Sequence, residues 1–68
     1  MPFEVLVNGE PRPVAEGQTI LALLRDLGLD PSRVAVELDR RIVKQPLWSE
    51  TILRAGAQVE IVQFVGGG

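Results

Sequence analysis

The chain of 68 residues contains no cysteine and no histidine. Without cysteine it forms no disulfide, no thiolate metal site and no thiol nucleophile of its own. Without both residues, the usual zinc ligand sets and the histidine-based catalytic arrangements cannot be built. Chemistry that involves this protein therefore needs a reactive group of another kind.

Long apolar runs and a basic excess are also absent. No stretch approaches the length that spans a bilayer, and residues 1–4 lack the pattern of a secretory signal. The formal net charge of −2 leaves no basic stripe for nucleic acid. We expect a cytoplasmic protein that binds neither membrane nor nucleic acid and is monomeric on its own.

The first part of the sequence predicts a β-hairpin. Apolar residues alternate over residues 3–7, which is typical of a strand, and Asn8-Gly9 is a favoured two-residue turn. A second strand is expected over residues 12–15. It is placed at a sheet edge because Pro11 and Pro13 have no N–H to donate.

One helix is predicted after the hairpin. Thr19 is placed to cap it, and Gly28 and Pro31 to end it. Its apolar face has the i, i+3, i+4, i+7 spacing and consists of Ile20, Leu23, Leu24 and Leu27.

Alternation then predicts strands over residues 34–38 and 41–44, joined by a turn at Asp39-Arg40. Residues 45–50 are expected to form a turn or one loose helical turn. The last apolar run, residues 59–65, predicts a strand in the middle of the sheet that the helix covers on one side.

This order predicts an α+β domain over residues 1–65, in which a mixed sheet of four to five strands packs on one main helix. Residues 66–68 are expected to form a flexible tail.

The tail carries the candidate reactive group. Gly66, Gly67 and Gly68 have no Cβ, so another protein can approach this backbone closely. Three extended residues reach about 10 Å. We predict that the tail enters a narrow channel and delivers the Gly68 carboxylate to a partner; the alternative is an idle chain end.

Segments along the whole chain resemble the ThiS family, sulfur carriers of thiamine biosynthesis with the ubiquitin-like β-grasp fold. These segments are Asn8-Gly9-Glu10, residues 17–20, Leu23-Leu24, residues 34–39, Ile42-Val43, Trp48 and the closing glycines. The chain departs from the family at Asp39, where asparagine is usual, and at Lys44-Gln45, where Pro-Arg is common.

The resemblance implies a carrier protein that is not an enzyme and binds no cofactor. It implies that an E1-like adenylating enzyme uses ATP to convert the Gly68 carboxylate to an acyl-adenylate. A cysteine-derived persulfide sulfur then displaces AMP and leaves a thiocarboxylate. Thiazole synthase is the implied recipient of the sulfur, while Gly66 and Gly67 thread the tail through a tight channel.

Two aromatic residues are further candidates for partner binding. Trp48 is either an interface anchor or, as the favoured interpretation, a side chain packed over the small core. Phe64 is either a core residue or the rim of a docking surface beside the tail.

Charged residues add no site of their own. The only local basic cluster is expected to be solvated, with steering toward an acidic partner as the alternative, and consists of Arg40, Arg41 and Lys44. No metal is assigned, because no ligand spacing appears among Asp26, Asp30, Glu37 and Asp39.

Three other functions stay open. The small subunit of molybdopterin synthase is also a thiocarboxylate carrier, although the short spacing from Leu29 to Val34 favours the thiamine carrier. A ubiquitin-like modifier would join Gly68 to a lysine of another protein. A plain interaction module would have an inert tail.

Overall fold

The computed structural model describes residues 3–64 and has the predicted α+β architecture. Its elements are β1 (Phe3–Val7), β2 (Glu10–Val14), α1 (Ile20–Asp26), η1 (Pro31–Arg33), β3 (Val34–Leu38), β4 (Arg41–Val43), η2 (Gln45–Leu47) and β5 (Gln58–Gln63). The strands form one sheet in the order β2-β1-β5-β3-β4. Strands β1 and β5 are parallel, and the other neighbours are antiparallel. The central position predicted for the last strand is confirmed.

The first hairpin turns at Asn8 and Gly9, whose φ angles of 50° and 85° are both positive. This two-residue turn pairs Val7 directly with Glu10. As a result β2 starts at Glu10, two residues before the predicted start, and ends at Val14, one residue before the predicted end.

The prolines of β2 lie at the edge of the sheet, as predicted. Pro11 pairs with Leu6 and Pro13 with Glu4. Hydrogen-bonded pairs alternate along an antiparallel ladder, starting here from Val7 and Glu10 beside the turn. Pro11 and Pro13 therefore occupy the positions at which the ladder needs no N–H from β2.

Helix α1 starts at the predicted cap. The Thr19 Oγ1 accepts a hydrogen bond of 3.2 Å from the backbone N–H of Ala22. Its buried residues are Ile20, Leu23 and Leu24.

The helix also ends as predicted. Gly28 has a φ of 73°, and the N–H groups of Gly28 and Leu29 donate to the carbonyl oxygens of Arg25 and Leu24 at 3.0 and 2.9 Å. These two bonds form a Schellman motif, in which glycine takes the left-handed position. The helix has 7 residues and is therefore about 10 Å long, too short to cover the whole inner face of the sheet.

The segment between β4 and β5 crosses back over the helix start. The Ile20 N–H donates to the Thr51 carbonyl oxygen at 3.0 Å, and the Leu53 N–H donates to that of Gln18 at 2.8 Å. These bonds hold Leu53 in the core, where it is fully buried. The predicted loose helical turn is the short helix η2.

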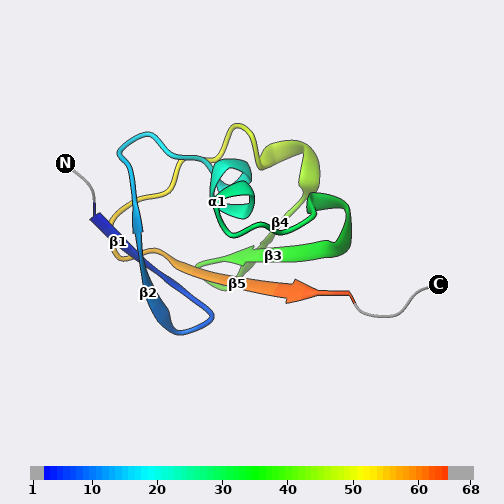
Figure 1. The fold of residues 1–68 in the computed structure, drawn as a ribbon, viewed down its shortest axis with the longest axis horizontal. Coiled ribbons are helices and arrows are strands. Elements are labelled where there is room, and N and C mark those ends of the chain that lie inside the picture. Colours follow the sequence, from blue (N-terminus) through cyan, green and yellow to red (C-terminus); the bar gives the residue numbers. More distant parts are fainter. Residues whose placement is uncertain (1–2, 65–68) are drawn as a thin grey trace.

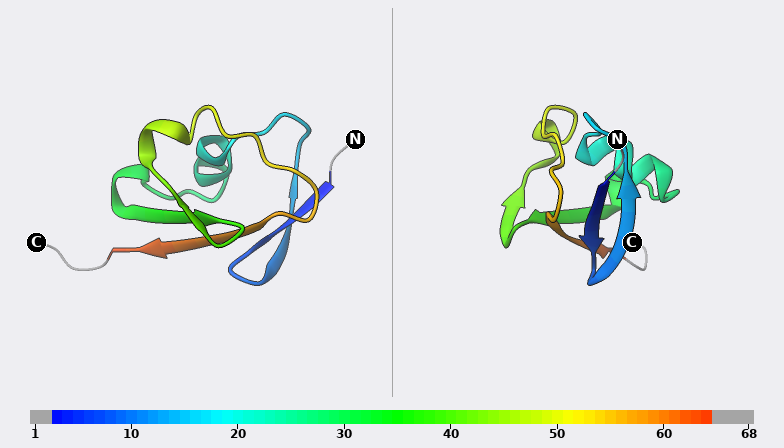
Figure 2. Two further views of the ribbon diagram at one scale, coloured as in Figure 1. Left: turned by 180° about the vertical axis from the view of Figure 1, so that it is seen from behind. Right: turned by 90° about the vertical axis from the view of Figure 1, so that its left-hand side faces the viewer.

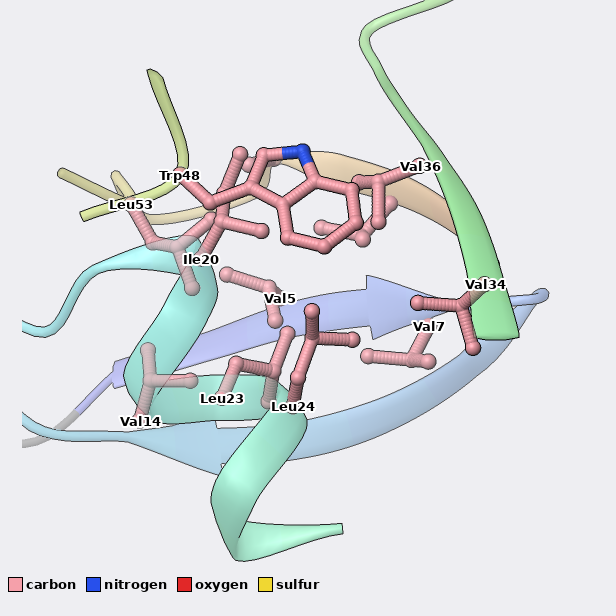
Figure 3. Close-up of a cluster of buried hydrophobic side chains, with 12 residues drawn as sticks. Val5, Val7, Val14, Ile20, Leu23, Leu24, Val34, Val36, Trp48 and Leu53 are labelled. Carbon is pink, nitrogen blue, oxygen red and sulfur yellow. The ribbon is translucent and has the colours of Figure 1, made fainter. Parts of the chain in front are cut away.

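The core lies between the sheet and the helix. Figure 3 shows helix residues Leu23 and Leu24 facing Val5 and Val7 of β1, with the Trp48 ring above them. Burying such side chains stabilises the fold by about 1.5–3 kcal/mol each, so this cluster is its main source of stability.

Helix α1 and the crossing segment lie on the same side of the sheet (Figures 1 and 2). Within residues 3–64 no helix covers the other side. Among those residues, no helix is long and apolar enough to cross a membrane.

Candidate partner-binding site

Strand β5 lies in the middle of the sheet and is the last strand before the C-terminal residues of the chain. The Asp39 N–H donates to the Gln58 carbonyl oxygen at 2.8 Å, and the Phe64 N–H donates to that of Arg33 at 2.7 Å. The ladder with β3 therefore extends one residue past β5. In Figure 1 the orange strand runs away from the β1–β2 hairpin. The candidate residues Gly66, Gly67 and Gly68 lie outside the described residues.

The uncovered side of the sheet carries exposed apolar side chains, and we call it the open face. Its central residues line a hollow of about 370 Å³ and include Ala35, Glu37, Ile42, Glu60 and Val62. Of these, Ile42 is 74% exposed and Val62 60% exposed. An exposed apolar patch of this kind is typical of a protein-binding site.

Phe64 continues the open face toward the tail. Side chains alternate along an extended strand, so Glu60, Val62 and Phe64 share one side. Phe64 is 57% exposed. The interpretation of Phe64 as a core residue is therefore wrong, and the rim of a docking surface remains the prediction for it.

Trp48 belongs to the core. It is 3% exposed, and its ring N–H donates to the Val43 carbonyl oxygen at 2.7 Å. The favoured interpretation of Trp48 as a packing residue is confirmed. The other interpretation, an exposed interface anchor, does not fit this geometry, because a buried ring offers a partner almost no surface.

The basic cluster runs from the turn between β3 and β4 to the residue after β4. Asp39 and Arg40 have φ angles of 50° and 70°, and Arg40, Arg41 and Lys44 are all exposed. The Asp39 carboxylate accepts a 2.9 Å hydrogen bond from the Gln58 N–H. Asp39 thus holds the start of β5 in place.

Asn8 has a role that its place in a turn did not reveal. Its side-chain amide donates to the Ile61 carbonyl oxygen at 3.1 Å, and its side-chain oxygen accepts from the Ile61 N–H at 2.7 Å. The two residues are 53 positions apart in the chain. The side chain therefore acts as one more strand residue, which extends the β1–β5 ladder beyond the turn.

Asp26 and Asp30 make hydrogen bonds that serve the fold. Asp26 accepts from the Gln18 side chain at 2.7 Å, and Asp30 accepts from the Ser32 N–H and O–H at 2.9 and 2.8 Å. In the described part of the chain, no group of three potential metal ligands comes together.

A mixed sheet that wraps one helix, with the last strand in its middle, defines this domain as a ubiquitin-like β-grasp. The chain matches the ThiS family over residues 5–68 and belongs to that family of sulfur carriers.

Three relatives illustrate the match. The crystal structure of the thiamine biosynthesis protein ThiS from Geobacter metallireducens superimposes with a TM-score of 0.82 and 32% identity, covering 97% of this chain and 100% of that one. The sulfur carrier protein ThiS of Thermus thermophilus is 38% identical over 64 residues, which cover 94% of this chain and 98% of the relative.

The third relative is a thiazole synthase of Magnetococcus marinus. It is 37% identical over 66 residues, which are 97% of this chain and 20% of that protein. The chain thus spans about a fifth of the length of this relative.

Proposed function

We propose that this chain carries sulfur for the formation of the thiazole ring of thiamine, with the Gly68 carboxylate as the site of attachment. The observation that carries the proposal is the central strand β5, which pairs with β1 at its start and with β3 along its length and leads directly into residues 65–68. A rigid domain of this kind offers partner enzymes a binding surface of fixed geometry close to the carboxylate on which they act. The chain itself acts as a co-substrate and not as an enzyme.

The first step converts a poor electrophile into a reactive one. A carboxylate oxygen of Gly68 attacks the α-phosphorus of ATP in the E1-like adenylating enzyme, and pyrophosphate leaves. In the acyl-adenylate that results, the acyl carbon is bonded to AMP, which is a good leaving group.

Sulfur enters in the second step. The terminal sulfur of a cysteine-derived persulfide attacks the acyl carbon, and AMP departs. The product is an acyl disulfide that has a new carbon–sulfur bond and keeps the sulfur–sulfur bond of the persulfide. A thiolate then attacks the donor's cysteine sulfur, which forms a disulfide between the two and releases the thiocarboxylate on Gly68. Because the chain has no cysteine, the donor and the thiolate both belong to partners.

The recipient in this proposal is thiazole synthase. Support comes from the Magnetococcus marinus relative, in which a segment similar to this chain is part of a protein named thiazole synthase. A carrier joined to the enzyme that consumes its cargo reaches that enzyme at high effective concentration.

The open face is the proposed docking surface for the adenylating enzyme. It combines exposed Ile42 and Val62 with Phe64, the last described residue before the tail. An enzyme bound there lies beside the start of the tail. Glu37 and Glu60 favour basic residues on the part of the enzyme's surface that faces the hollow.

The substitution Gly67→Val tests the threading of the tail. A branched side chain is expected to block entry into a tight channel and to abolish ATP–pyrophosphate exchange by the adenylating enzyme. Ala15→Val, which adds similar bulk at an exposed position after β2, is the matched control and is expected to retain the exchange. Normal exchange with Gly67→Val would contradict the threading role.

A further inference from the structure

Within residues 3–64, the edge of β5 that faces β1 has no strand beside it at Gln63. Backbone groups alternate between the two edges of a strand, and those of residues 58 and 64 point to β3. The N–H and C=O groups of Val59, Ile61 and Gln63 therefore point to the β1 side. Asn8 satisfies Val59 through its backbone N–H and Ile61 through its side chain.

No residue of the β1–β2 hairpin lies opposite Gln63, the next β5 residue whose backbone points to the β1 side. The parallel register of β1 with β5 ends at Val7 and Val59, and the chain turns back after Asn8. Among residues 3–64, no strand lies opposite Gln63 on this edge. An unpaired strand edge is a template for one more strand.

A groove lies beside this edge on the helix side of the sheet, and we call it the edge groove. Its volume is about 250 Å³, and its lining includes Glu10, Arg12, Leu27, Leu29, Ile61 and Gln63. It exists because α1 ends before it reaches this part of the sheet. The volume lies below the roughly 300–1,000 Å³ of small-molecule sites, so it suits one or two side chains of a peptide.

The walls of the edge groove define the chemistry of its occupant. Leu27, Leu29 and Ile61 are only partly buried, so they offer an aliphatic surface. Arg12 and Glu10 stand on the β2 side with opposite charges. An extended segment fits these features if one of its aliphatic side chains enters the groove. Its main chain then runs along Gln63 and can bond to the backbone groups of that residue.

We propose that this occupant is an extended segment of the adenylating enzyme, which adds to the sheet beside β5 in the position that β1 would take if it continued. The inference rests on the proposed function. Four residues follow Phe64, and extended they span at most about 14 Å. An enzyme that holds the Gly68 carboxylate against ATP therefore reaches within about 14 Å of Phe64, the neighbour of Gln63.

The composition of the tail favours this mode of binding. Glycine residues offer a partner no side chain, so their N–H and C=O groups are the only polar handles. Attack on ATP requires the reacting atoms to be held about 3–3.5 Å apart. Strand pairing that starts at Gln63 fixes the direction in which the tail leaves the domain.

Amide hydrogen exchange of the intact protein, measured by NMR, tests the proposal. In the free protein, the Gln63 N–H is expected to exchange rapidly, whereas the Phe64 N–H, bonded to Arg33, is protected. Saturation with the adenylating enzyme is expected to slow exchange at Gln63 at least about tenfold. Unchanged exchange at Gln63 in the saturated complex would overturn the proposal.

Two other occupants are outcomes of the same experiment. If thiazole synthase protects the Gln63 N–H and the adenylating enzyme does not, the edge binds thiazole synthase. If the N–H becomes protected when only the carrier concentration is raised, the edge binds a second copy of this chain. Either result would overturn the assignment to the adenylating enzyme.

A pair of variants gives a functional readout. Gln63→Pro removes the N–H that faces the empty edge and leaves the bonds to β3 intact, so kcat/KM for adenylate formation is expected to fall about tenfold. Gln63→Ala keeps the N–H and is expected to lose less than about threefold. Equal rates for the two variants, both with the wild-type melting temperature, would contradict strand addition. Absence of adenylate formation by the wild-type chain would instead count against the proposed function itself.

Discussion

The two faces of one sheet differ in what covers their apolar side chains. On the helix side, Val5, Val36 and Val59 are each 1% exposed. On the open face, Ile42 is 74% exposed and Val62 60% exposed. The strands contribute aliphatic residues to both sides, but in the described part of the chain a helix and a crossing segment lie over one side alone (Figure 2).

The difference separates stability from binding. Burial of apolar surface stabilises a fold only if the surface leaves water when the chain folds. Side chains of the open face stay in water in the free protein, so they contribute little until a partner covers them. Substitutions on the two faces test that separation, and substitutions elsewhere in the fold are expected to have smaller effects.

The largest effect is expected for Leu24→Ala in the core. Leu24 is fully buried, and its truncation leaves a cavity that is expected to lower the free energy of unfolding by about 2–5 kcal/mol. Urea unfolding monitored by Trp48 fluorescence measures this change. The matched control Ile42→Ala on the open face is expected to change stability by less than about 0.5 kcal/mol. Similar losses for both variants would remove the distinction between the faces.

Phe64→Ala is expected to affect binding and not stability. Phe64 is exposed, so its loss is expected to leave the urea midpoint nearly unchanged but to weaken binding of the adenylating enzyme by about 1–3 kcal/mol. Isothermal titration calorimetry measures the affinity. Full affinity of Phe64→Ala would exclude this end of the open face from the interface.

A smaller effect is expected at the turn that holds β5. Asn8→Gly keeps the positive φ but removes both side-chain bonds to Ile61, and it is expected to lower stability by about 1 kcal/mol. Arg40→Gly, in the other two-residue turn, is expected to raise stability by up to about 1 kcal/mol, because it relieves a φ of 70°. Thermal unfolding of the two variants measures both signs, and a loss of stability in Arg40→Gly would show that its side chain makes a stabilising contact.

The smallest effect concerns pH and a residue on neither face. Hydrogen bonds from the Ser32 O–H and N–H lower the pKa of Asp30 below its usual value of 3.8. The carboxylate therefore adds stability above the pKa of the unfolded chain, and this contribution is lost as the pH falls through the lower folded pKa. The fall in Tm between about pH 5 and about pH 3 is expected to be slightly smaller in Asp30→Asn than in the wild type. An equal fall in both proteins would show that Asp30 is not linked to folding.

Local signals predicted most of the fold. Thr19 and Gly28 mark the helix ends through backbone rules that need no knowledge of distant residues, and Asn8-Gly9 marks the hairpin in the same way. The ends of the strands follow less directly from the sequence than the ends of the helix. Alternation predicts the last strand over residues 59–65, of which residue 65 lies outside the described residues. Strand β5 is Gln58–Gln63, because its bounds depend on where β3 and the hairpin lie beside it.

The site was predicted less completely than the fold. Alternation in the last strand shows that both of its faces are apolar, but it does not show which one the helix covers, so the exposure of Val62 and Phe64 had to come from the structure. The bonds between Asn8 and Ile61 join residues far apart in the chain, and no local pattern indicates them. The same holds for the free edge at Gln63, which exists only because the hairpin turns away from β5.

The most direct test is the intact mass of the protein after incubation with ATP, the adenylating enzyme and a persulfide donor. The proposed function predicts a mass gain equal to the replacement of one oxygen by one sulfur, located on the peptide that ends at Gly68. An unchanged mass, with an adenylating enzyme from the same source that is shown to be active, would contradict the assignment of this chain as a sulfur carrier.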